Sequence, residues 1–310
     1  MTIDVSIVIP AFNESTRLAN GYDRLSPVLE RMGVERCEII VVDDGSGDDT
    51  MIRAHEVYGH LPETLFVQQP HNLGKGAALR LGMGLARGAH VITADADMAI
   101  DPSCIPTMIE HLREAPIAPG SRTEQGAIRY DSRLRTVAGG AFNRLVRHYT
   151  GTQLRDTQCG CKGFQAGAAR VIALVGMIDR FAFDAELLFV ADRLDLAVRP
   201  VHVTWRDVEG SSVRVGHDSF EMLRDMRGLS RTRYENPVVQ TSPDVAIEPI
   251  AQAARAARVH GLAVARGADD ALVVLPRDGA LGGLGIAATL GGTLRVAGLD
   301  ELRGRRFEAV

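Results

Sequence analysis

Two carboxylates separated by one small residue, Asp95-Ala96-Asp97, directly follow the apolar run 90–94. If that run is a strand, the pair lies at its carboxyl end, where open α/β sheets bind their ligands. Carboxylate oxygens suit a hard cation such as Mg²⁺ or Mn²⁺, which needs only one or two of them when nucleotide phosphates complete its coordination. The alternative is that the pair only caps the helix expected after Pro102.

Short β-rich runs alternate with helical patterns through the first third of the chain. This alternation predicts a βαβαβαβ unit with a mostly parallel sheet. The expected strands are 5–10, 37–42, 64–68 and 90–94, and the expected helices are 16–32, 48–58 and 75–87. Right-handed crossovers place the carboxyl ends of parallel strands on one edge, so residues 10–14, 43–46 and 95–97 are expected to line one crevice.

The middle of the chain is expected to form the binding surface for a second substrate. It contains a short strand ending at Pro119, a basic helix at 133–148, a loop to Gly163, helices as far as Leu196 and a strand at 199–205. Residues 220–234 are amphipathic and rich in arginine. That pattern fits either a helix at a membrane surface or ordinary packing against the core.

The character of the sequence changes after residue 236. Thr241-Ser242-Pro243 predicts a linker, 250–260 an Ala/Arg helix, and the remainder Gly-rich turns with strand-like runs such as 271–275. We therefore expect two units, residues 1–236 and a C-terminal extension at 237–310, and we see no chemistry in the extension.

Composition excludes several classes of protein. The chain has 310 residues and a formal charge of −4, which argues against a general nucleic-acid binder. No apolar run reaches the roughly 20 residues that a membrane-spanning helix needs, and the start of the chain lacks a leader pattern, so we expect a cytoplasmic protein. Nearly all the positive charge is arginine, because lysine occurs only at Lys75 and Lys162. Four scattered cysteines are expected to be reduced and structural: Cys37, Cys104, Cys159 and Cys161.

Four motifs of the expected crevice occur in a characteristic order and spacing: VIPAFNE at 8–14, VVDDGS at 41–46, NLGKG at 72–76 and DAD at 95–97. In this the chain resembles the family 2 glycosyltransferases of the GT-A type. Four later motifs resemble the branch that makes polyprenyl-phosphate sugars, especially the dolichyl-phosphate β-glucosyltransferases: GSR at 120–122, RDTQCG at 155–160, FDAELL at 183–188 and WRDVEGS at 205–211. The resemblance covers about residues 3–235 and implies a GT-A fold, an α/β architecture with a mostly parallel central sheet and flanking helices, to which a small α/β C-terminal extension is added.

The resemblance implies a nucleotide-sugar donor, and the residue types fit the chemistry of its leaving group. Sugar transfer from a nucleotide requires stabilisation of the departing diphosphate. A cation held by Asp97, with Asp95 near the ribose or sharing the cation, would neutralise that charge. The other candidate nucleotide-binding residues are Pro10, Phe12, Glu14, Asp44 and Lys75. Turn capping is the alternative for Glu14 and Asp44, and a solvated side chain is the alternative for Lys75.

Arginines and two carboxylates are the candidates on the acceptor side. Arg122 and Arg135 match family positions and are expected to contact a phosphate, while Arg214 stands near the place where related synthases carry a lysine. Asp156 and Asp184 are the candidate catalytic residues, either to deprotonate a hydroxyl or to orient a phosphate that is already ionised. The alternative for Asp184 is that it caps a helix at 186–193.

Three functions remain open on the sequence. The first is inverting, metal-dependent transfer of a hexose, with glucose from UDP-glucose as the first choice, to a polyprenyl phosphate by a protein that touches the cytoplasmic face of the membrane peripherally. The second is a soluble GT-A transferase that acts on a small phosphorylated or glycan acceptor. The third is a non-catalytic nucleotide-sugar binder whose tail engages a partner. The sequence predicts no oligomeric state.

Overall fold

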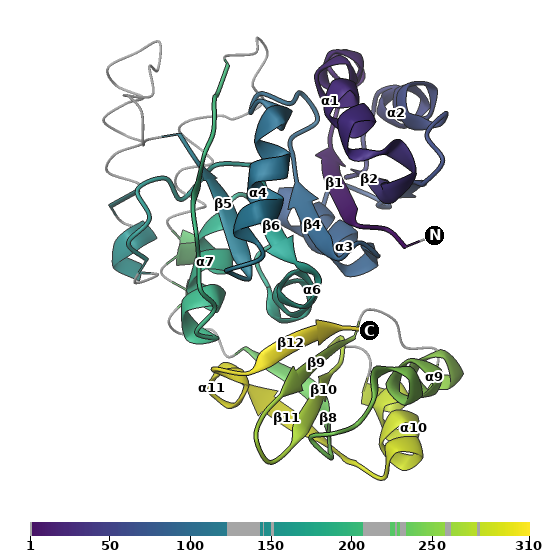
Figure 1. The fold of residues 1–310 in the computed structure, drawn as a ribbon, viewed down its shortest axis with the longest axis vertical. Helices are drawn as coiled ribbons and strands as arrows, with labels where there is room; N and C mark the ends of the chain where they lie inside the picture. The colour runs from purple at the N-terminus through teal and green to yellow at the C-terminus, as the bar shows by residue number, and fades with distance from the viewer. Residues whose placement is uncertain are drawn as a thin grey trace.

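The computed structural model describes residues 2–122, 143–144, 146–149, 152–206, 224–226, 228–229, 234–257, 262–277 and 280–310. Within these ranges the chain forms one seven-stranded and one five-stranded sheet, which lie one above the other in Figure 1. The five-stranded sheet is built entirely from residues after Tyr234.

The first four strands form a parallel half-sheet in the order β3-β2-β1-β4. The elements are β1 (Val5–Ala11), α1 (Leu18–Met32), η1 (Val34–Arg36), β2 (Cys37–Asp43), α2 (Thr50–Tyr58), β3 (Thr64–Gln68), α3 (Lys75–Leu85) and β4 (His90–Thr93). β1 and β2 are nearly continuous apolar runs because helices cover both faces of a parallel sheet. The expected alternation of strands and helices is confirmed.

The second half of this sheet departs from the expected pattern. The chain continues through η2 (Pro102–Cys104), α4 (Ile105–His111), β5 (Ile117–Ser121), β6 (Lys162–Gln165), α6 (Ala166–Val175), α7 (Phe183–Arg193) and β7 (Val201–His202). β6 inserts antiparallel between β4 and β5, where the sequence predicted only a loop to Gly163. Four residues are too short a run to show a strand period. The strand expected at 199–205 is only the two residues of β7, with Trp205 in a separate bridge to Ile100.

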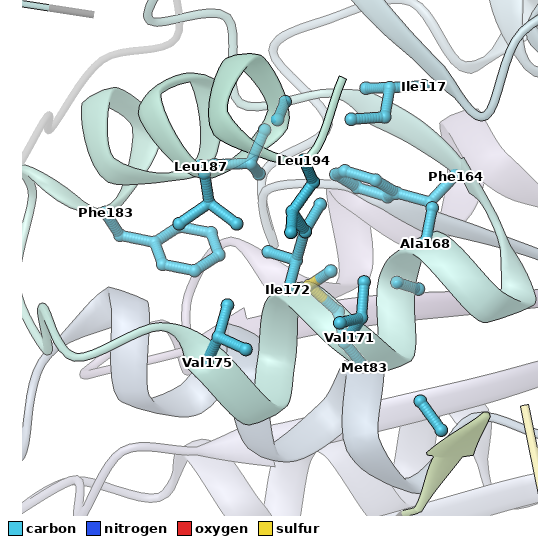
Figure 2. Packing of buried hydrophobic residues seen from close by; sticks show 14 of the residues in the cluster. Met83, Ile117, Phe164, Ala168, Val171, Ile172, Val175, Phe183, Leu187 and Leu194 are labelled. Carbon is cyan, nitrogen blue, oxygen red and sulfur yellow. The ribbon is translucent and has the colours of Figure 1, made fainter. Parts of the chain in front are cut away.

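Helices pack on both faces of the seven-stranded sheet. One core lies beneath α1, α2 and α4. The other is formed with α3, α6 and α7, and Figure 2 shows Met83, Phe164, Ile172 and Leu187 meeting there. A Cβ on Gly82 would lie 2.3 Å from Cγ1 of Val8, so a glycine is what allows α3 to approach β1 this closely.

The C-terminal sheet is entirely antiparallel, in the order β11-β8-β10-β9-β12. Its elements are β8 (Glu235–Thr241), α9 (Ile247–Ala257), β9 (Ala263–Arg266), β10 (Ala271–Val274), α10 (Ala280–Leu290), β11 (Thr293–Gly298), α11 (Leu299–Leu302) and β12 (Arg306–Ala309). The predicted linker at 241–243 is wrong. Val238 and Val239 are buried and Thr241 pairs with Ala271, so the chain is already part of this sheet before the turn at Pro243.

The C-terminal unit, formed by the described residues from Tyr234 onward, shares a core with the unit around the seven-stranded sheet. α9 and α10 cover one face of the C-terminal sheet, and its other face packs against α6 (Figure 1). A Cβ on Gly167 of α6 would lie 2.1 Å from the carbonyl oxygen of Phe307, so helix and strand touch backbone to backbone. Nδ2 of Asn236 also donates to the carbonyl of Leu174 at 3.2 Å.

Two sequence predictions concern segments that are described only in part. Arg135 and Arg214 lie outside the described residues. Of the helix expected at 220–234, residues 224–226, 228–229 and 234 are described, and Met226 and Leu229 are buried in the core that contains α3, α6 and α7. Those two side chains favour packing over a membrane contact. Across the described ranges, we find no helix with the length and apolar character needed to span a membrane.

Candidate active site

Two loops at the carboxyl ends of β1 and β2 are joined by hydrogen bonds. The backbone N–H of Asn13 donates to Oγ of Ser46 at 2.9 Å, and the N–H of Gly47 donates to Oδ1 of Asn13 at 3.0 Å. Asn13 has a φ of 55°, a left-handed conformation that asparagine tolerates better than most residues. The first and second crevice segments therefore lie together, as the topology predicted.

The neighbouring aspartates at the end of β2 have different partners. Asp43 accepts from the N–H of Ser46 at 3.1 Å and from Nε2 of Gln68 at 2.9 Å, so it shapes its own turn. Asp44 accepts from the N–H groups of Leu73 and Gly74 at 2.8 and 2.9 Å. Burial raises the pKa of Asp44, although these two amides act in the opposite direction. Asp44 therefore holds the loop that precedes α3, and its contact with a nucleotide stays a prediction.

Glu14 forms a two-point ion pair with Arg17. Nη2 donates to Oε1 at 2.7 Å, and Nε lies 2.6 Å from Oε2. Burial raises the pKa of Glu14 to about 7 despite Arg17, and Asp97 and Asp95 add to the rise. Nη1 of Arg17 lies 3.9 Å from Oδ2 of Asp97. The sequence interpretation missed Arg17, although a carboxylate and an arginine three residues apart at a helix start are a recognisable signal.

The Asp95–Asp97 loop is held by its own backbone and by α1. Oδ1 of Asp97 accepts from the N–H of Ala99 at 3.0 Å. A Cβ on Gly21 would lie 2.1 Å from the carbonyl oxygen of Ala96, so α1 touches the loop directly. The helix-capping alternative for this pair is wrong, because Asp101 caps η2 by accepting from the N–H of Ser103 at 3.0 Å.

Asp95 is paired with Lys75, the first residue of α3. Nζ lies 2.5 Å from Oδ1, so Lys75 points into the crevice rather than standing solvated. A Cβ on Gly160 would lie 2.2 Å from Oδ2 of Asp95, so only a glycine lets the backbone pass this close to the other carboxylate oxygen. Burial alone would raise the pKa of Asp95, but Lys75, Lys162 and Arg122 outweigh it and hold that pKa low.

A second lysine, Lys162 of β6, pairs with Asp184. Its Nζ lies 2.5 Å from Oδ1 of Asp184 and also donates to the carbonyl of Cys159. Only 3% of the Lys162 side chain is exposed. The capping alternative for Asp184 is wrong, because α7 begins at Phe183 and this side chain lies in its first turn without capping it. The overlooked signal was composition: a chain that otherwise uses arginine places both of its lysines here.

Two residues predicted separately, Arg122 and Asp156, are bound to each other. Nε of Arg122 donates to Oδ2 at 2.7 Å, Nη2 donates to Oδ1 at 2.9 Å, and the backbone N–H adds a third bond at 3.0 Å. Asp156 is 3% exposed. Burial would raise its pKa, but Arg122 outweighs that effect and lowers it. Asp156 is thus suited to orient a guanidinium.

The residues present fit a cation that is bound jointly with a diphosphate. Within the described ranges there is no group of three or more His, Cys, Asp or Glu side chains that would enclose a metal by itself. Asp95 and Asp97 supply two carboxylates of the hard-donor type. Mg²⁺ retains several waters and commonly takes one or two carboxylates together with substrate phosphates. Such a site requires no third protein ligand.

Comparison with known proteins gives the following matches. The model of "Glycosyl transferase family 2" matches residues 6–172. The dolichyl-phosphate β-glucosyltransferase of Drosophila melanogaster is 34% identical over 240 residues, covering 73% of this chain and 74% of the relative. The human protein of that name is 33% identical over 249 residues, covering 75% and 76%.

Solved structures match at lower identity. Glucosyl-3-phosphoglycerate synthase from Mycobacterium tuberculosis, in complex with phosphoglyceric acid, has a TM-score of 0.55 at 22% identity, over 74% of this chain and 80% of that one. Mannosyl-3-phosphoglycerate synthase from Rubrobacter xylanophilus has a TM-score of 0.55 at 16% identity, over 74% and 76%. At these identities the likeness shows a shared fold.

Proposed function

The chain belongs to glycosyl transferase family 2 and is a glycosyltransferase with the GT-A fold, and from this we propose that it transfers glucose from UDP-glucose to a polyprenyl phosphate with inversion at the anomeric carbon. The names of the curated relatives, dolichyl-phosphate β-glucosyltransferases, support both the sugar and the class of acceptor. A lipid acceptor requires access to a membrane surface, so the proposal includes peripheral contact at the cytoplasmic face.

The ion pairs of the two candidate acceptor carboxylates carry this proposal. Transfer to a hydroxyl commonly requires a carboxylate that accepts its proton. Asp156 is bound to Arg122, and Asp184 is bound to the buried Lys162. A phosphate monoester is already ionised near neutral pH and needs orientation instead of deprotonation. The arrangement therefore supports an acceptor that brings its own negative charge.

In the proposed reaction, an oxygen of the lipid phosphate attacks the anomeric carbon while the bond from that carbon to the diphosphate oxygen breaks. UDP leaves with the bonding electron pair. Arg122, oriented by Asp156, would contact the acceptor phosphate, and Arg135 and Arg214 stay proposed partners from outside the described residues. Lys75 would contact the donor diphosphate from the amino end of α3, where the helix dipole also favours negative charge.

The donor's remaining parts would meet the loops after β1 and β2. Phe12 directly follows β1 and is 39% exposed, and with Pro10, Glu14 and Asp44 it would surround the base and ribose. Asp95 and Asp97 would hold Mg²⁺ or Mn²⁺. When bound, such a cation supplies charge neutralisation on the departing diphosphate.

A radiolabelled transfer assay tests the proposal. The full chain is incubated with Mn²⁺ and labelled UDP-glucose, and the acceptor is either undecaprenyl phosphate in detergent or 3-phosphoglycerate. We expect labelled product that extracts into organic solvent only when the lipid is present. Labelled product that stays in water would instead support a small phosphorylated acceptor. UDP-glucose binding without transfer to either acceptor would contradict the proposal and favour a binding protein, and GDP-mannose in a parallel reaction tests the choice of donor.

A further inference from the structure

Residues 176–182 join α6 to α7 and lie against the first turn of α3. The N–H of Ala77 donates to the carbonyl of Asp179 at 3.0 Å. A Cβ on Gly74 would lie 2.4 Å from that carbonyl oxygen, and a Cβ on Gly76 would lie 2.5 Å from the carbonyl oxygen of Ile178. Because these are backbone contacts, a shift of the 176–182 loop would move the turn that carries Lys75.

The same loop is tied to the C-terminal unit through Glu186 of α7. Oε1 of this buried carboxylate accepts from the N–H of Met177 and from the hydroxyl of Tyr234, both at 2.9 Å, and Oε2 accepts from the N–H of Ile178 at 2.9 Å. Tyr234 is itself buried and directly precedes β8. One carboxylate therefore links the start of the C-terminal sheet to two successive amides of the loop.

Arg277 makes a second link from the C-terminal unit. This residue follows β10, and its Nη1 and Nη2 donate to the carbonyls of Gly176 at 3.0 Å and Val175 at 2.5 Å. These carbonyls lie at the carboxyl end of α6, where a cation is favoured by the helix dipole. A Cβ on Gly176 would lie only 3.4 Å from Oε2 of Glu186, so both links converge on the start of the loop.

We propose that the C-terminal unit positions the donor end of the active site. Arg277 holds Val175 and Gly176 directly, and Tyr234 holds residues 177–178 through Glu186. Residues 178–179 contact the first turn of α3, and that turn places Lys75 against Asp95. Arg277 and Tyr234 act as positioning residues. The kinetic part of this inference rests on the proposed function, whereas its structural part does not.

Steady-state kinetics of the full chain test the kinetic part. Arg277→Ala is expected to raise KM for UDP-glucose by about 3- to 10-fold, less than the full effect of losing charged hydrogen bonds because Arg277 acts on Lys75 only through the loop, and to leave KM for the lipid acceptor unchanged. Arg277→Lys should recover part of the donor KM because an ammonium can still reach one carbonyl. The matched control is Arg295→Ala, since Arg295 contacts Gln240 and Glu301 within the C-terminal unit. A donor KM that stays unchanged, or that rises equally in both alanine variants, would overturn the inference.

Amide hydrogen exchange gives a test that needs no turnover. Tyr234→Phe removes one donor to Glu186, and we expect exchange in peptides covering 74–80 and 176–182 to accelerate by about fivefold, while Arg295→Ala leaves both unchanged. If the wild-type protein transfers no glucose but these peptides respond, the proposed function fails and the positioning role stands. If the protein transfers glucose and neither Tyr234→Phe nor Arg277→Ala alters exchange at 74–80, the positioning role fails alone.

Discussion

The two units of this protein differ in what they bury. The unit around the seven-stranded sheet buries charged side chains, among them Asp44, Asp156, Lys162 and Glu186. In the described part of residues 235–310, by contrast, Asn236 is the one buried polar side chain. Burying charge is costly unless each group is paired and hydrogen-bonded. The difference indicates that the first unit is built around chemistry and the second around an apolar core that supports it.

The largest expected effect is at the carboxylate pair. Asp97→Ala should lower kcat for sugar transfer by about 100- to 1000-fold, the cost of removing one group that stabilises the leaving charge. The matched control is Asp101→Ala, which removes the cap of η2 and should cost about 1 kcal/mol of stability with little effect on turnover. Equal losses of turnover in the two variants would show that the loop's conformation, and not its charge, is what matters.

Buried and exposed ion pairs give the next contrast. Lys162→Met removes the cationic partner of the Asp184 carboxylate and should lower the free energy of unfolding by about 3–5 kcal/mol. Arg295→Met breaks a partly exposed pair with Glu301 in the C-terminal unit and should cost at most about 1 kcal/mol. Urea denaturation followed by far-UV circular dichroism measures both. Similar losses of stability in the two variants would contradict the difference in buried charge between the two units.

Glycines in helices of the two units provide a third comparison, which concerns packing. A methyl group on Gly21 would meet a backbone carbonyl of the Asp95–Asp97 loop. Because this carbonyl cannot move without moving the site, Gly21→Ala should lower the free energy of unfolding by about 1–3 kcal/mol. A methyl group on Gly283 of α10 meets only the ends of the Leu275 and Leu294 side chains, 2.5 and 2.8 Å away. Because these side-chain ends can shift, the free energy of unfolding of Gly283→Ala should stay within about 1 kcal/mol of the wild-type value. Thermal unfolding of both variants measures these losses of stability. A larger loss in Gly283→Ala than in Gly21→Ala would contradict the prediction.

The smallest expected effect is a pH dependence of stability in the first unit. The pKa of Asp156 is lowered in the folded state by Arg122, so its contribution is fully present above the unfolded-state pKa of about 3.9 and is lost as pH falls through the folded-state pKa. Asp156→Asn should therefore be less stable than wild type at pH 7, and the difference should shrink as the pH is lowered past about 4. Urea titrations at pH 7, 5 and 3 measure it. A difference that is constant with pH would indicate that the pair contributes no electrostatic stability.

The sequence by itself determined the parallel half-sheet, the family and the segments that line the crevice. Strand and helix periods are local properties, and the right-handed crossover rule then brings the strand ends to one edge. For this reason the sequence alone predicts that residues 10–14, 43–46 and 95–97 lie at one edge of the sheet, and the structure confirms it. The antiparallel strand β6 could not be predicted in this way, because its four residues gain their partners only from β4 and β5.

Tertiary structure decided which charges neutralise one another. Lys75 and Asp95 are 20 residues apart, Lys162 and Asp184 are 22 apart, and Arg122 and Asp156 are 34 apart. No periodic pattern links such positions, since their distance depends on strand register and on how closely glycines let the backbone approach. The same holds for Arg277, which contacts the start of the 176–182 loop, and for Tyr234, which reaches that loop through Glu186. Both contacts exist only because the C-terminal sheet shares a core with α6. The sequence named the charged residues, and the packing of distant segments assigned their partners.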